Sequence, residues 1–141
     1  MTEERVSFDT KVAIIVLEDL PVWQKLNVTA FLATGVAGAA PEAMGEPYAD
    51  AAGRRFARLL GQPILVFAAT AEGLLGAWRV ALERDLTRAA YVRAMFATGH
   101  DAANRAAFGA ESAEAPDLVG LALRGPKKAM DRATKGLALH R

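Results

Sequence analysis

The feature that most constrains the fold is a short, unbroken run of apolar residues near the beginning of the chain. Residues 11–17 read Lys-Val-Ala-Ile-Ile-Val-Leu, and after the lysine every side chain is aliphatic. A continuous run, without the alternation of a half-exposed strand, is typical of a strand that is covered on both faces. Such strands occur mainly in sheets flanked by helices. The run therefore predicts an α/β fold.

The remainder of the chain alternates between helical and strand patterns. After the first strand, the sequence predicts a helix from about Pro21 to Gly38, with Asp19 accepting hydrogen bonds in its first turn and Glu18 favouring its dipole. Residues 45–60 are predicted as a loop or small hairpin, with a short helix over 51–60 as the alternative. The later predictions are a strand at 62–69, a helix capped by Thr70, a strand at 89–95, a short helix at 98–108, a strand at 118–123 and a helix at 126–135.

This order of elements predicts one domain over residues 1–141. Strands that alternate with helices imply a three-layer α/β/α arrangement with helices on both faces of the sheet. No run of 18 apolar residues is present, and the polar, acidic start is unlike a signal peptide. We therefore expect a cytoplasmic protein with no membrane partner.

The amino-acid composition excludes several kinds of catalytic and metal site. Seventeen basic and sixteen acidic residues leave a net charge of +1. This charge does not indicate a nucleic-acid partner, and it does not exclude one. The chain has no cysteine, so disulfides, thiolate nucleophiles and cysteine-based metal sites are excluded. The two histidines are far apart, and no nucleophile elbow or phosphate-binding glycine motif is present. We expect neither a metal nor another cofactor.

Four segments together resemble a known family. They are Lys-Val-Ala-Ile-Ile-Val-Leu-Glu-Asp-Leu-Pro-Val-Trp-Gln-Lys-Leu-Asn-Val-Thr-Ala-Phe, Gly-Glu-Pro-Tyr-Ala-Asp, Gln-Pro-Ile-Leu-Val-Phe and Gly-Leu-Ala-Leu-Arg-Gly-Pro-Lys-Lys. The chain resembles, over nearly its whole length, a small bacterial family of conserved domains of unknown function, number two thousand in its series. The resemblance implies the fold of type II peptidyl-tRNA hydrolases, which is a mixed four-stranded sheet between helices with one antiparallel strand.

The resemblance to the hydrolases is partial at the level of residues. Lys25 falls where the hydrolase lysine could lie, and Gly125-Pro126, Asp131 and Thr134 resemble the hydrolase's last helix. The Ala-Ala-Gln segment of the first helix and the Gln-Asp-Ala-Gly-Arg-Thr segment of the third strand have no equivalent. Because fold alone does not carry function, hydrolysis of a peptidyl- or aminoacyl-tRNA-like ester is an alternative function.

The first candidate site is the basic start of the last helix. A strand runs into this helix, whose free N–H groups and dipole favour an anion, and the surrounding residues are Arg124, Gly125, Lys127 and Lys128. The alternative is a solvated basic helix whose Gly-Pro pair only shapes the turn. The functional interpretation predicts a small anionic ligand at the carboxyl edge of the sheet, where α/β proteins usually bind ligands.

Three further groups are weaker candidates. Glu18 and Asp19, with Lys25 and Asn27, could form a polar or catalytic cluster, or the acids could only cap the helix. His100 and Asp101 could supply a general base, or Thr98 and Asp101 could form a capping box while Asp101 pairs with Arg105. Tyr48 could close over a ligand, or pack beneath a turn.

Three functions therefore stay open from the sequence. The first is a small anionic-ligand-binding protein or enzyme, and the second is the ester hydrolase that the resemblance implies. The third is a non-catalytic homodimer, which associates through the apolar, Ala- and Gly-rich surface of residues 30–40.

Overall fold

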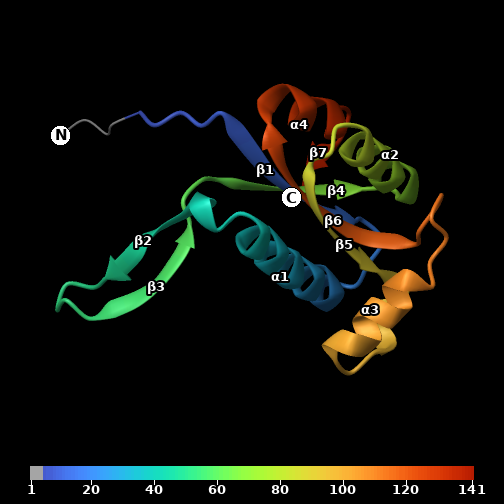
Figure 1. Ribbon diagram of the computed structural model, residues 1–141, viewed down its shortest axis with the longest axis horizontal. Helices are drawn as coiled ribbons and strands as arrows, with labels where there is room; N and C mark the ends of the chain where they lie inside the picture. The colour runs from blue at the N-terminus through green and yellow to red at the C-terminus, as the bar shows by residue number, and fades with distance from the viewer. Residues whose placement is uncertain (1–4) are drawn as a thin grey trace.

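The computed structural model describes residues 5–141 and contains a five-stranded mixed sheet with helices on both faces (Figure 1). The strands of this sheet, in spatial order, are β5 (Thr87–Val92), β6 (Leu118–Pro126), β1 (Thr10–Leu17), β4 (Ile64–Ala69) and β7 (Ala138–Leu139). The α-helices are α1 (Val22–Ala39), α2 (Ala71–Glu83), α3 (Asp101–Gly109) and α4 (Lys127–Ala133). None of these helices is both long and apolar enough to cross a membrane.

The strand directions are mixed. β1 pairs parallel with β4, whereas β6 is antiparallel to both β1 and β5, and β7 is antiparallel to β4. Strands β1, β4 and β5 therefore run one way, and β6 and β7 run the other way. The α/β/α prediction is confirmed, but the expected four strands with one antiparallel are wrong. The additional strand, β7, has two residues, too few to leave a pattern in the sequence.

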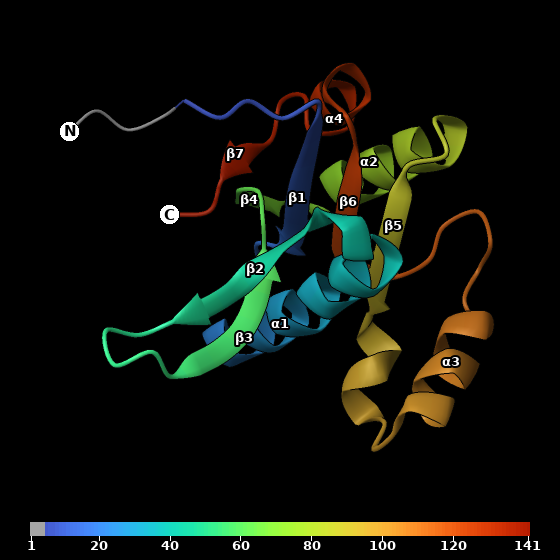
Figure 2. The ribbon, with the colours of Figure 1, turned by 60° about the vertical axis from the view of Figure 1, so that its left-hand side comes forward.

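The core is built around β1, which lies in the middle of the sheet. Residues 12–17 are all buried, and no polar or charged residue is buried anywhere in residues 5–141. Figure 2 shows α1 crossing one face of the sheet, while α2 and α4 cover the other. The continuous apolar run of β1 is therefore explained by burial on both faces, as its sequence predicts.

Two glycines allow α1 to lie unusually close to the sheet. A Cβ atom at Gly120, on β6, would lie 2.4 Å from Cγ1 of Val28 and 2.9 Å from Cδ1 of Leu32. A Cβ atom at Gly35, on α1, would lie 2.7 Å from the Cβ of Ala89 on β5. Real side chains do not tolerate such contacts. The two glycines therefore set the depth at which α1 packs on the sheet.

Residues 44–60 form a hairpin that stands apart from the main sheet. A short 3-10 helix, η1 (Pro41–Ala43), links α1 to strands β2 (Met44–Ala49) and β3 (Arg55–Leu60), which pair only with each other. At its turn, a carboxylate oxygen of Asp50 accepts from the backbone N–H groups of Ala52 and Arg54, each at 2.9 Å. The hairpin prediction is confirmed, and the alternative of a helix over residues 51–60 is wrong.

Element boundaries differ from the prediction in two places. The strand that the sequence predicts at residues 89–95 is β5, which ends at Val92. The residues that follow it form the 3-10 helix η2 (Arg93–Ala97). Strand β6 does not break before Gly125-Pro126, because Lys11 pairs with Gly125 and Thr10 with Pro126. Helix α4 then begins directly at Lys127. The neighbouring strand β1 therefore extends β6 beyond the break that its local sequence suggests.

The close packing of α1 can be tested at Gly120. Gly120→Ala places a methyl group against Val28 and Leu32, so we expect the free energy of unfolding to fall by about 2 kcal/mol in urea denaturation. The matched control is Gly76→Ala on α2, where a Cβ atom meets nothing within 4 Å. That control should raise the free energy of unfolding by about 0.5–1 kcal/mol. Equal effects of the two substitutions would contradict the close packing.

Candidate functional site

The antiparallel direction of β6 separates the residues that the sequence grouped at one edge of the sheet. The end of β6, with Gly125, pairs with the beginning of β1, whereas Glu18 and Asp19 follow the end of β1. The two groups therefore lie at opposite edges of the sheet. Arg124, Lys127 and Lys128 lie at the carboxyl end of β6, which is the opposite edge from the carboxyl ends of β1 and β4, because strand direction is not encoded in a strand's own composition.

The basic residues around α4 do not converge on one point. The Nε of Arg124 donates to Oε1 of Gln62 at 3.0 Å, and its guanidinium lies 3.4 Å from a carboxylate oxygen of Glu42. Arg124 thus links β6 to the segments before β4 and β2. Lys128 is exposed, while Lys127 lines a small cavity of about 320 Å³ together with Lys11.

The polar residues at the start of α1 do not form a cluster. Glu18 and Asp19 are both exposed, and the expected capping bond from Asp19 is not formed, because Pro21 occupies the N-cap position without a side-chain bond. The Nζ of Lys25 lies 3.2 Å from Nε2 of His140, and Asn27 is exposed. Lys25 therefore contacts the end of the chain rather than the acids.

His100 has a structural position at the start of α3. Its Nδ1 accepts from the backbone N–H of Ala103 at 3.2 Å, so His100 is itself the N-cap residue. The predicted capping box of Thr98 and Asp101 is therefore wrong, and the hydroxyl of Thr98 instead donates to the carbonyl of Met95 at 2.8 Å. The predicted ion pair between Asp101 and Arg105 is confirmed.

Tyr48 lies on β2 of the hairpin and is more than half exposed. The hairpin pairs with no strand of the main sheet, and Tyr48 pairs with Phe56 of β3 near the turn. The turn itself is held by Asp50, whose carboxylate lies 2.7 Å from the Nε of Arg54. Hydrogen bonds from the backbone and then the side chain of Arg54 lower the pKa of Asp50 below its ordinary value of 3.8.

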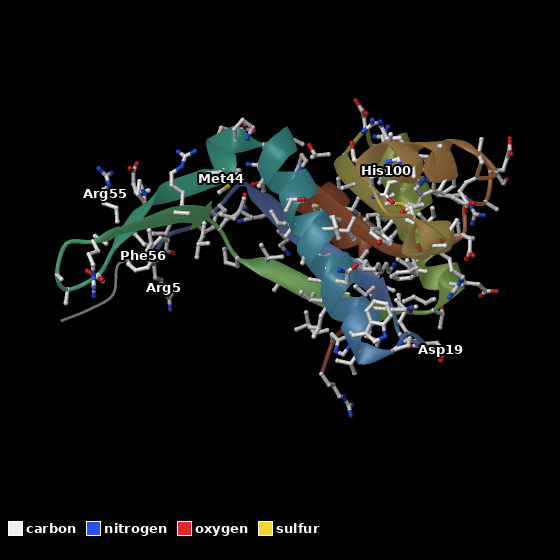
Figure 3. The ribbon with its side chains drawn as sticks, turned by 90° about the horizontal axis from the view of Figure 1, so that it is seen from below. Arg5, Asp19, Met44, Arg55, Phe56 and His100 are labelled. Atoms are coloured by element: carbon white, nitrogen blue, oxygen red, sulfur yellow. The ribbon has the colours of Figure 1, made fainter. Side chains whose placement is uncertain are left out.

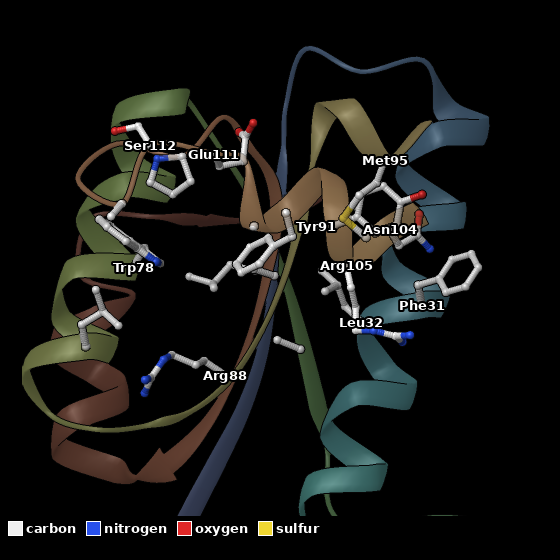
Figure 4. Close-up of a pocket in the computed structure, with 18 of the residues that line it drawn as sticks. Phe31, Leu32, Trp78, Arg88, Tyr91, Met95, Asn104, Arg105, Glu111 and Ser112 are labelled. Atoms are coloured by element: carbon white, nitrogen blue, oxygen red, sulfur yellow. The ribbon is translucent and has the colours of Figure 1, made fainter. Parts of the chain in front are cut away.

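A concavity lies along β5, an edge strand of the sheet, and the sequence did not indicate it. It is a cleft of about 970 Å³ between the helices that flank this strand, and Figure 4 shows its side chains. Its walls come from α1, α2, β5, η2, α3 and the loop that follows α3. The principal lining residues are Phe31, Trp78, Arg88, Tyr91, Asn104 and Phe108.

An aromatic group forms the wall between α1 and β5. The ring centroids of Phe31 and Tyr91 lie 6.0 Å apart, and those of Tyr91 and Phe96 lie 5.2 Å apart. Trp23 continues the group, with its ring 6.2 Å from Phe96 in an edge-to-face arrangement. Offset and edge-to-face geometries of this kind stabilise aromatic pairs. The rings therefore pack on one another, with Tyr91 between Phe31 and Phe96.

Tyr91 is one of the residues that line the cleft. The residue is 5% exposed, and burial raises the pKa of its phenol above the ordinary value of 10.0. Its hydroxyl has no hydrogen-bond partner within residues 5–141, and this part of the chain contains no fully buried polar side-chain atom that lacks a partner. The hydroxyl oxygen is therefore not fully buried, and the raised pKa keeps the group a neutral donor.

The charged residues of the cleft largely neutralise one another. Arg105 pairs with Asp101, and Arg88 pairs with Asp85 at 3.2 Å and also donates to the carbonyl of Leu86. Glu111 adds a further acid to the rim. No group of three or more potential metal ligands occurs in the described chain. The cleft consequently suits a mostly apolar molecule with one hydrogen-bonding group.

Comparison with known proteins places the chain in a family. The sequence pattern of a family described as "Protein of unknown function (DUF2000)" matches residues 10–141. The chain belongs to this family. Its structure is similar to that of a protein of unknown function, Atu0240, from Agrobacterium tumefaciens strain C58. The two share 50% identity and a TM-score of 0.92, over 96% of this chain and 100% of the other. No curated protein matches the chain.

The environment of Tyr91 in this DUF2000 protein can be tested by titration. The chain has two tyrosines, so in a Tyr48→Phe variant the phenolate absorbance reports Tyr91 alone. We expect a midpoint above pH 10.0, because burial disfavours the charged form. Since this pKa is raised in the folded state, its contribution to stability is complete below the unfolded pKa and is lost as the pH rises through the folded value. A midpoint at or below 10.0 would contradict the burial.

Proposed function

We propose that the protein binds a small, mostly apolar molecule, with a ring or acyl body and one polar group, in the cleft along β5. The observation that carries this proposal is Tyr91, which lines the cleft, packs its ring against Phe31 and Phe96, and has a hydroxyl that forms no hydrogen bond within residues 5–141. A ligand that accepts a hydrogen bond from this hydroxyl would satisfy it while stacking against the aromatic wall.

The size and lining of the cleft support the proposal. Sites for small molecules commonly enclose about 300–1,000 Å³ and have apolar walls with a few placed polar groups. The cleft of about 970 Å³ lies within this range, and Asn104 and Ser112 add polar groups beside Tyr91. The strand order also leaves one side of β5 without a strand partner. Its backbone groups are a second source of hydrogen bonds for an extended ligand.

The proposal is tested by screening small aromatic and acyl compounds, because a ligand that binds only the folded state raises the melting temperature. For a confirmed ligand, Tyr91→Phe should weaken binding about fivefold in calorimetric titration, since one neutral hydrogen bond is lost while the ring remains. Tyr48→Phe, on the hairpin, is the control and should leave affinity unchanged. Equal affinity of the Tyr91→Phe variant would overturn the role given to this hydroxyl.

An anionic ligand beside α4 is a second candidate. The supporting observation is the cavity of about 320 Å³ that is lined by Lys11, Lys127, Thr10 and Gln62. Inorganic phosphate and nucleotides are the probes. Their binding should be abolished in the Lys127→Ala, Lys128→Ala double variant and should be unaffected by Tyr91→Phe. Binding that survives the double substitution would reject this second site.

The ester-hydrolase alternative continues to rest on the resemblance in fold to type II peptidyl-tRNA hydrolases. Lys25 is the residue to test, because the resemblance places a functional lysine near it, and in this chain it lies 3.2 Å from His140. A peptidyl-tRNA hydrolysis assay, with Lys25→Ala as the inactive control, separates this function from ligand binding in the cleft.

A further inference from the structure

The β2–β3 hairpin is an arm that its own chain does not cover. Tyr48, Phe56 and Leu59 are each more than half exposed, and six of the other nine residues of the two strands are exposed as well. A two-stranded hairpin without further packing is marginally stable in water. Figure 1 shows the arm projecting from the body of the molecule beside the end of α1. Its apolar side chains therefore need a surface to cover them.

Helix α1 carries a second apolar surface on the side that faces away from the sheet. Val28, Leu32 and Val36 are buried against the strands, but Val22, Trp23 and Leu26 are each more than half exposed. A surface helix normally has a polar outer side, and a helix that is apolar all round is normally buried on all sides. Val22, Trp23 and Leu26 therefore form an apolar patch on the outer side of α1.

The charged residues on the arm and those beside the apolar surface of α1 have opposite signs. On the arm, Arg54 pairs with Asp50, whereas Arg55 and Arg58 form no ion pair within residues 5–141. Beside the apolar surface of α1, Glu18 and Asp19 are exposed and also form no ion pair with any residue that the structure describes. The arm is therefore complementary to the beginning of α1 in both apolar character and charge.

One chain cannot join its own two surfaces. The arm leaves from η1, at the end of α1, whereas Glu18 and Asp19 lie at the beginning of that helix. Figure 3 shows Arg55 and Phe56 on the arm, well separated from Asp19 at the far end of α1. Helix α1 has 18 residues, which corresponds to a length of about 27 Å. The complementary partner of each surface must therefore come from another molecule.

We propose that this molecule is a second copy of the chain, and that two copies form a symmetric dimer by exchanging arms. If two α1 helices lie antiparallel about a two-fold axis, the end of each helix lies beside the beginning of the other. Each arm then covers Val22, Trp23 and Leu26 of its partner copy, with Arg55 and Arg58 near Glu18 and Asp19. One contact made twice is the usual form of a two-fold interface.

The size of the surfaces is sufficient for such a dimer. The three apolar side chains on the arm and the three on α1 are each more than half exposed. At roughly 100 Å² for each side chain, two copies bury on the order of 1,200 Å², the lower end of specific interfaces. In the Ala- and Gly-rich second half of α1, which the sequence suggested as the dimer surface, Gly35 packs on the sheet while Gly38 and Ala39 are exposed.

The first test is the mass of the protein in solution, measured by sedimentation equilibrium at micromolar concentrations. The chain of 15.0 kDa should sediment with twice that mass. Leu26→Glu on α1 and Phe56→Glu on the arm should each give the monomer mass, because each places a charge within the apolar contact. Leu82→Glu is the control, since Leu82 is an exposed apolar residue on α2, across the sheet from α1. It should remain a dimer.

A chemical crosslink provides a second test that does not depend on a destabilising charge. The chain has no cysteine, so Phe56→Cys and Leu26→Cys variants each carry a single thiol. When the two variants are mixed with a short bis-maleimide, they should form a covalent heterodimer, whereas Phe56→Cys mixed with Leu82→Cys should not. A monomer mass for the natural chain, a dimer that survives either glutamate substitution, or equal crosslinking of both mixtures would each overturn the arm exchange.

Discussion

The packing of α1 at the depth set by Gly120 and Gly35 is the constraint on which the rest of the structure depends. At both positions a Cβ atom would lie less than 3 Å from a neighbouring side-chain carbon atom. Because α1 lies this close to β6 and β5, Phe31 reaches Tyr91 and forms the wall of the cleft. The same packing fixes where α1 ends, and therefore where the β2–β3 arm leaves the body.

Helix α1 thus contributes to two surfaces. Its inner side completes the core, and its outer side leaves Val22, Trp23 and Leu26 exposed. The cleft and the arm lie at different places along this helix, so the proposed ligand binding and the proposed self-association use different surfaces. They share one link, because Trp23 packs against Phe96, which in turn packs against Tyr91 in the cleft wall. A second copy of the chain that covers Trp23 would therefore stabilise the aromatic wall through Phe96.

Much of the fold could be predicted from the sequence, because many of its elements are determined by residues that are close together in the chain. The apolar run of β1, the hydrogen bond from Gly73 to the hydroxyl of Thr70, and the turn at Asp50 each depend on a few neighbouring residues. The candidate site was not predictable in this way. The antiparallel direction of β6 separated Arg124 from Asp19, and the cleft is assembled from elements distant in the sequence. An ordinary apolar strand position gave no sign that Tyr91 lies at the centre of the cleft.

Amide hydrogen exchange at low and high protein concentration tests most directly whether α1 is covered on both sides. The close packing on the sheet predicts slow exchange in α1 at both concentrations, because its inner side belongs to the core. The arm, residues 44–60, should exchange rapidly in dilute solution and become protected as the concentration rises. Arm amides that exchange rapidly and equally at every concentration would contradict the account.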